Sequence, residues 1–174
     1  PADGMDVDRY LAEAFGSSEA GRSALGEVAA VGEEEGIRFK FDQLDLVPNT
    51  MNAHRLILLA ESEDRGDQMA DTLFRGFFEQ GRDIGRIEVL TDLAAEIGLD
   101  SVAAETYLVG DKNRTLVRSR EARVRSAGLT GVPSLIVNGR LAISGVHDPE
   151  VLLQVIDRAL FEDLPESPSP KSLH

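Results

Sequence analysis

The side chains able to act as nucleophiles or metal ligands are few in this chain. None of the 174 residues is cysteine, so the sequence contains no thiolate nucleophile, no disulfide and no Cys-ligated zinc site. Imidazole is supplied only by His54, His147 and His174. Nothing in the spacing of these histidines predicts that they meet, and a single histidine is more often packed or capping than a ligand. We therefore assign no metal and no catalytic residue within the chain.

The segment Thr130-Gly131-Val132-Pro133 is the main candidate for a binding site. Pro133 stands at the head of an expected strand, where a proline cannot donate a hydrogen bond to the ladder. A cis peptide bond between Val132 and Pro133 would turn the Val132 N–H and C=O outward, toward a bound molecule. Only about 5% of X–Pro bonds in folded proteins are cis, so the local pattern alone favours a trans proline. The order of the surrounding elements favours the cis form.

The elements that precede this segment are predicted to be helical. Start and stop signals and helical spacing of apolar residues indicate helices at 6–16, 17–36, 49–60, 69–78, 87–98, 100–108 and 113–127. Alternation of Ile37, Phe39 and Phe41 with basic residues predicts a brief extended segment with one buried face. Asn49 is expected to cap the helix that carries His54, and this helix is apolar on almost every side, so it should lie deep in the fold.

Sheet-forming sequence appears only after residue 128. Residues 134–137 and 140–143 are joined by Asn138-Gly139, the pair best suited to a type I′ turn, and we predict a β-hairpin. Asp148 and Pro149 then begin a helix. The apolar residues of that helix expected to face inward are Val151, Leu152, Val155, Ile156 and Ala159. We divide the chain into a mainly helical region at 1–128, the hairpin and helix at 129–161, and a disordered tail at 162–174.

The charge of the chain argues against two classes of partner. There are 31 acidic and 18 basic residues, for a formal net charge of -13. Such a surface repels phosphate backbones and anionic lipid headgroups. The sequence also lacks an apolar run of the roughly 20 residues needed to span a bilayer. We therefore expect no nucleic-acid partner and no membrane association.

Three stretches together resemble the DsbA family of thioredoxin-fold proteins. The order of elements near the C-terminus is similar to that in the last third of that family. A helix is followed by Thr130-Gly131-Val132-Pro133, an Asn-Gly hairpin, the Ile143-Ser144-Gly145 turn and a helix that begins at Asp148-Pro149. Residues 48–56, Pro-Asn-Thr-Met-Asn-Ala-His-Arg-Leu, and residues 142–152, Ala-Ile-Ser-Gly-Val-His-Asp-Pro-Glu-Val-Leu, are similar to its FrnE-like branch. The resemblance covers most of residues 1–160.

This resemblance implies an α/β, thioredoxin-like fold of the DsbA type with an all-helical insertion. It implies a cytoplasmic thiol-disulfide oxidoreductase that acts on a disulfide peptide or on glutathione and needs no other cofactor. Substrate would contact Thr130, Gly131, Val132 and Pro133, with His54 and Asn49 near the groove. The family's first strand, its Cys-Pro-x-Cys helix and its second strand would precede Pro1, and they are absent from this sequence. The chain alone is therefore expected to be inert in thiol exchange.

Two other functions fit the same architecture. Enzymes of the 2-hydroxychromene-2-carboxylate isomerase and glutathione transferase kappa group use a serine in place of the first cysteine and bind glutathione. The Asn-Gly hairpin and the Ile-Ser-Gly turn fit that group less well. The other alternative is a binding module without catalysis. In each case the hairpin would have an unpaired apolar edge, which we expect a missing N-terminal segment, a partner chain or a second copy of the chain to cover.

Overall fold

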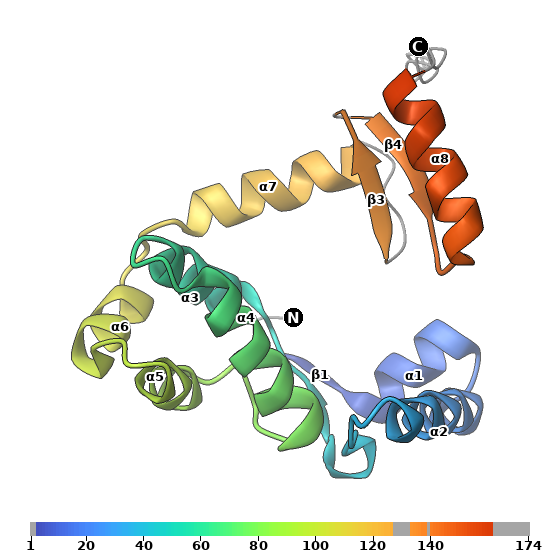
Figure 1. Cartoon of the computed structure of the whole chain (residues 1–174). Helices are drawn as coiled ribbons and strands as arrows, with labels where there is room; N and C mark the ends of the chain where they lie inside the picture. Colours follow the sequence, from blue (N-terminus) through green and yellow to red (C-terminus); the bar gives the residue numbers. More distant parts are fainter. Residues whose placement is uncertain (1–2, 127–132, 139, 162–174) are drawn as a thin grey trace, which may run out of the picture. The chain divides into compact units, whose positions relative to one another are not determined.

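The structure is a computed structural model that describes residues 3–126, 133–138 and 140–161, with the side chains of 140–142 excepted. Contacts divide the chain into two compact units, Pro1–Val117 and Arg118–His174, and each is described by itself (Figure 1). The first unit contains α1 (Val7–Phe15), α2 (Ser18–Glu34), α3 (Met51–Glu61), α4 (Gly66–Phe74), α5 (Ile87–Glu96) and α6 (Ser101–Val109). Helix α7 (Arg114–Ser126) begins in the first unit and ends in the second.

Helices α1 and α2 pack against each other, and their ends follow the sequence signals. Asp6 accepts a hydrogen bond from the Arg9 N–H at 2.9 Å and so begins α1, and Gly16, with φ of 86°, ends it. Ser17 begins α2 by accepting from the Ala20 N–H at 3.1 Å. Short polar side chains thus satisfy the first free N–H groups of both helices, as the sequence predicts.

The core of the first unit lies among α3, α4, α5 and α6. Its most deeply buried apolar side chains are Leu56, Met69, Leu90, Leu93 and Leu108. Helix α4 continues directly into a π-helical turn, η2 (Arg75–Glu79), where buried Gly76 lies against Leu93. The predicted helix at 69–78 is therefore present, but it changes its hydrogen-bonding pattern halfway. In the part of the chain that the structure describes, no helix is long and apolar enough to cross a membrane.

At 37–41, where a brief extended segment with one buried face is predicted, Phe39 and Phe41 are half-buried and Ile37 is exposed. This stretch leads into a single 3₁₀ turn, η1 (Phe41–Gln43), and pairs with no strand among the described residues. Phe39 and Phe41 instead stack on each other at 4.8 Å and meet the edge of Phe78, so their alternation reflects an aromatic cluster. The short antiparallel pair of the first unit is β1 (Met5–Asp6) with β2 (Leu46–Val47).

The second unit contains the predicted hairpin and the helix after it. Strands β3 (Ser134–Val137) and β4 (Arg140–Ser144) are antiparallel, with Val137 opposite Arg140. Asn138 has φ of 51°, as the predicted two-residue turn requires. Helix α8 (Pro149–Phe161) follows, and its half-buried residues are Leu152, Val155, Ile156 and Ala159. Val151 is exposed, contrary to the prediction, because it lies at the open first turn of α8.

Candidate functional site

Pro133 lies exposed at the head of β3, and its carbonyl group is held in place. The Gly145 N–H donates to the Pro133 carbonyl oxygen at 2.8 Å. Next to this bond, the hydroxyls of Ser134 and Ser144 lie 3.1 Å apart across the hairpin. These two contacts connect the beginning of β3 to the end of β4. Thr130, Gly131, Val132 and the predicted cis bond between Val132 and Pro133 lie outside the described residues.

The turn after β4 is ordered by a histidine that also entered the sequence analysis. The Nε2 of His147 lies 2.9 Å from the carbonyl oxygen of Ser144, and His147 is exposed. Gly145, between them, has φ of 94°, a conformation that favours glycine. Asn138 reaches α8, donating from Nδ2 to the Ala159 carbonyl oxygen at 3.2 Å. These contacts connect the two ends of the hairpin to the helix that follows it.

Asn49 and His54 belong to the first unit, at the beginning of α3. The Asn49 Oδ1 accepts from the Met51 N–H at 3.0 Å, so Asn49 supplies the predicted cap, although the helix boundary falls at Thr50. His54 is exposed on α3 and accessible to a ligand. The two residues are five positions apart in sequence, with Asn49 just before the helix and His54 within it. Pro133 lies in the other unit.

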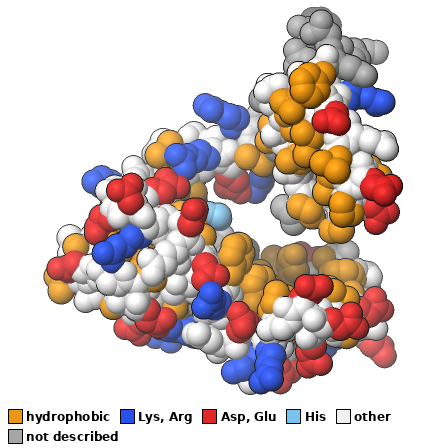
Figure 2. Space-filling model, viewed as in Figure 1, with side chains coloured by type: hydrophobic (Ala, Val, Ile, Leu, Met, Phe, Trp, Pro, Cys, Tyr) orange, Lys and Arg blue, Asp and Glu red, His pale blue; other side chains and the backbone are white. Residues whose placement is uncertain are grey.

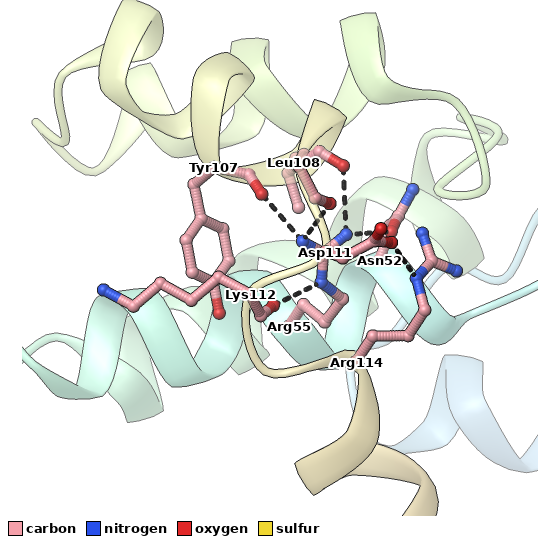
Figure 3. Close-up of polar contacts among 8 residues, drawn as sticks. Asn52, Arg55, Tyr107, Leu108, Asp111, Lys112 and Arg114 are labelled. Carbon is pink, nitrogen blue, oxygen red and sulfur yellow. Dashed lines mark hydrogen bonds and ion pairs between the residues drawn. The ribbon is translucent and has the colours of Figure 1, made fainter.

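Arg55, next to His54, is the one fully buried charged residue among those described, at 0% exposure. Its guanidinium has five N–H groups, and each has a partner (Figure 3). Nε donates to the Lys112 carbonyl oxygen, Nη1 to the Leu108 carbonyl oxygen and Asn52 Oδ1, and Nη2 to the Tyr107 and Gly110 carbonyl oxygens. These distances lie between 2.6 and 3.0 Å. We call these six residues the Arg55 network.

The charge of Arg55 is balanced mainly by peptide dipoles. Four of its five acceptors are backbone carbonyls at or just beyond the end of α6, where the helix macrodipole is negative. The Tyr107 ring lies 5.2 Å from the guanidinium carbon. Burial lowers the pKa of Arg55, the nearby positive charge of Arg114 lowers it further, and Tyr107 and Asp111 oppose the shift. Arginine stays protonated regardless, because its ordinary pKa exceeds about 12.

Sequence reasoning missed Arg55 because its pattern is ambiguous. An arginine within an apolar helix is usually assigned to the surface, with its charged end in water. The available signal was the presence of an arginine in α3, a helix predicted to be buried on almost every side. A charge in that position requires several acceptors, and helix ends provide unpaired carbonyls.

A shallow groove in the first unit lies between α2 and the segment before η1, with a volume of about 300 Å³. It is lined by Arg22, Leu25, Gly26, Ala29, Phe39, Phe41 and Asp42. Arg22 is already paired with Asp8 at 2.7 Å. The groove is therefore mainly apolar, and none of its lining residues is a nucleophile of the kind that thiol chemistry uses.

Comparison with known proteins places these features in a family. The family described as DSBA-like thioredoxin domain matches residues 8–157. The probable DsbA oxidoreductase SCO1869 of Streptomyces coelicolor has a similar structure, with a TM-score of 0.79 and 27% identity, over 95% of this chain and 71% of that one. A candidate protein disulfide isomerase of Nitrosomonas europaea shares the fold, with a TM-score of 0.65 and 23% identity, over 82% of this chain and 74% of that one.

The chain is also similar to a longer protein. The protein YwbO of Bacillus subtilis (strain 168), described as uncharacterized, is 28% identical over 133 residues, which are 74% of this chain. This chain spans 64% of the length of that relative. The family match extends over most of the described helices and through the hairpin into α8. The chain therefore belongs to the DSBA-like thioredoxin domain family and has a DsbA-like thioredoxin fold.

Proposed function

We propose that this chain carries the substrate-binding part of a thiol-disulfide oxidoreductase of the FrnE-like branch, acting in the cytoplasm. The observation that supports this most is the head of β3. The chain belongs to a family of DsbA-like domains and has an exposed Pro133 whose carbonyl accepts a hydrogen bond from the Gly145 N–H. The branch itself is inferred from residues 48–56 and 142–152.

Substrate binding would use the backbone of the loop before β3. The Val132 N–H and C=O would pair with an extended disulfide peptide or with glutathione as an added strand does. Thr130, Gly131 and Pro133 would shape the loop, and Asn49 and His54 would contact the substrate from the beginning of α3. Because the sequence has no cysteine, the reacting sulfur atoms must come from polypeptide outside it.

The chemistry proposed for the whole protein is thiol-disulfide exchange. A cysteine thiolate attacks one sulfur of the substrate disulfide, a mixed disulfide forms, and the other substrate sulfur leaves as a thiolate. A second cysteine then attacks the mixed disulfide and releases the reduced substrate. The protein is left with an oxidised pair, so electrons and atoms balance. In this scheme the present chain holds and orients the disulfide.

The absence of cysteine favours one further candidate, a binding module that keeps the fold and carries out no catalysis. It would bind the same peptides or glutathione through the same loop. It differs in one measurable respect, which is that no form of the gene product would reduce a disulfide.

The test compares the protein as it occurs in its source with the chain described above. Mass spectrometry after thiol alkylation should find a Cys-Pro-x-Cys peptide joined to the Pro1 segment, and that form should reduce insulin disulfides. The 174-residue chain should bind oxidised glutathione, seen as NMR shifts in residues 133–136, without reductase activity. Pro133→Ala should abolish these shifts, whereas Pro149→Ala, at the first turn of α8, should leave them unchanged.

The outcomes separate the alternatives. Binding without any cysteine-containing form would favour the non-catalytic module. Glutathione binding together with an upstream serine would favour the isomerase and glutathione transferase kappa group. A source protein that neither binds a disulfide compound nor reduces one would contradict the proposal altogether.

A further inference from the structure

Arg55 contacts the connection between α6 and α7, residues 110–113, at two points. It donates to the carbonyl oxygen of Gly110 at 2.6 Å and to that of Lys112 at 2.8 Å. Both bonds come from one planar group, so they fix the distance and direction between the two carbonyls. Gly110, Asp111 and Lys112 are exposed. The connection is therefore held chiefly from its inner side.

Two further side-chain contacts support this connection, and one of them involves a residue of the Arg55 network. Tyr107, whose carbonyl accepts from Arg55, also accepts through its hydroxyl from Asn113 Nδ2 at 3.1 Å. Asn113 has φ of 63°, which costs energy in a residue other than glycine and so needs support from its surroundings. Asp111 accepts from Arg114 Nε at 2.9 Å at the first residue of α7. The path from the end of α6 to the beginning of α7 is thus held by the hydrogen bonds of Arg55 together with these two side-chain contacts.

Helix α7 converts any change in this connection into a larger movement. It has 13 residues and crosses from the first unit into the second. A helix of that length is about 20 Å long, so a 10° change at its first turn displaces its far end by roughly 3.5 Å. Only Val117 of α7 is buried. The connection therefore contributes to setting the direction of α7.

We infer that Arg55 is a positioning residue that sets the stiffness of the joint at which α7 leaves the first unit. The inference rests on the contacts of Arg55 and is independent of the proposed thiol chemistry. Lysine at this position would keep the charge but provide three donors in place of five. At least two of the five acceptors would then lose their partner, and α7 should sample a wider range of directions.

The absence of cysteine in the chain makes the test direct. Two cysteines introduced at exposed positions, Glu88→Cys in α5 and Arg123→Cys in α7, can carry nitroxide spin labels. Pulsed electron paramagnetic resonance then gives the distribution of the distance between them. In Arg55→Lys this distribution should broaden by roughly a factor of two, because the Arg123 label lies about 13 Å along α7 from its first residue and moves with the helix. Arg9→Lys, an exposed arginine paired with Glu13, should leave it unchanged.

A reference pair distinguishes the joint from general loss of structure. Labels at Glu88→Cys and Asp67→Cys lie on α5 and α4, away from Arg55, and their distance distribution should stay the same in Arg55→Lys. Should Arg55→Lys fail to fold, Asn52→Ala removes one acceptor of the network and should broaden the α5–α7 distribution to a smaller extent. A folded Arg55→Lys with an unbroadened α5–α7 distribution would overturn the inference. The inference would also be overturned if Arg55→Lys failed to fold and the α5–α7 distance distribution of Asn52→Ala were no broader than that of the parent chain.

Discussion

Among single residues, Asp8 links two helices through one carboxylate. Its Oδ1 accepts from the Ser18 hydroxyl and from Arg22 Nε, the latter at 2.8 Å. Asp8 belongs to the first turn of α1, whereas Ser18 and Arg22 belong to the first two turns of α2. The hydrogen bond from Ser18 lowers the pKa of Asp8 most, and Arg22 lowers it further. Both donors stabilise the ionised form.

A pH titration tests this arrangement. Because the pKa of Asp8 is lower in the folded chain than in the unfolded one, Asp8 contributes stability above the unfolded pKa of about 3.9. That contribution is lost as the pH falls through the lower, folded pKa. Carboxyl ¹³C NMR should show Asp8 titrating below the usual range, and Ser18→Ala should move its midpoint upward. Ser23→Ala, which changes an exposed serine on the same helix as Ser18, should leave the midpoint of Asp8 unchanged.

Either of two results would contradict this account of Asp8. One is an unshifted Asp8 midpoint in the parent chain. The other is an equal response to Ser18→Ala and Ser23→Ala. The effect on stability should be small in every case, because the groups are exposed and solvent screens their attraction.

Arg55 shows the limit of prediction from sequence at this scale. The Asn49 cap and the beginning of α3 could be predicted, because capping depends on residues next to one another in sequence. Four of the five acceptors of Arg55 come from the end of α6 or just beyond it, more than fifty residues away along the chain. No local pattern contains that information. Asn49, which was predicted, and Arg55, which was not, stand six positions apart.

Among elements, α1 and α2 approach closely because a glycine lies between them. A Cβ atom on Gly21 would lie 2.6 Å from the Leu11 Cβ, and Leu11 is buried. On the same helix, a Cβ atom on Gly26 would meet nothing within 4 Å. The two glycines thus lie on one helix, but only at Gly21 would an added methyl group clash with a neighbouring side chain. They provide a matched pair of substitutions.

Replacing each glycine by alanine should change stability in opposite directions. Gly21→Ala should lower the free energy of unfolding by about 1–3 kcal/mol, the usual cost of overpacking. Gly26→Ala should raise it by about 0.5–1 kcal/mol, because alanine favours a helix interior. Urea unfolding followed by circular dichroism measures both. Equal effects, or a stabilising Gly21→Ala, would show that α1 and α2 are not packed as described.

The elements also show which patterns predict structure and which mislead. The Asn138-Gly139 hairpin was confirmed, because the turn chemistry and both strands lie within eleven consecutive residues, 134–144. The alternation of Phe39 and Phe41 accompanies an aromatic cluster around Phe78 and no paired strand among the described residues, because both arrangements can produce the same spacing. Strands β1 and β2, with two residues each, are too short to carry any periodicity.

At the scale of the whole molecule, both units leave apolar side chains exposed (Figure 2). In α2, Val31 is 61% exposed, and in the hairpin Ile136 is 50% exposed. None of the residues of α8 is buried, and Phe161 is 83% exposed. Among the described residues, β3 pairs with β4 and with no other strand. An isolated two-stranded sheet is only marginally stable in water.

We therefore predict that the 174-residue chain associates in solution, with the edge of β3 in the contact. An unpaired apolar strand edge can accept a strand from another chain. Size-exclusion chromatography with light scattering should show a mass above that of the monomer, decreasing on dilution. Ile136→Lys should shift the chain toward monomer, because an edge lysine opposes strand pairing. Val102→Lys, at an exposed valine of α6, should have no such effect. A chain that stays monomeric at every concentration while the hairpin remains folded would show that this edge needs no cover.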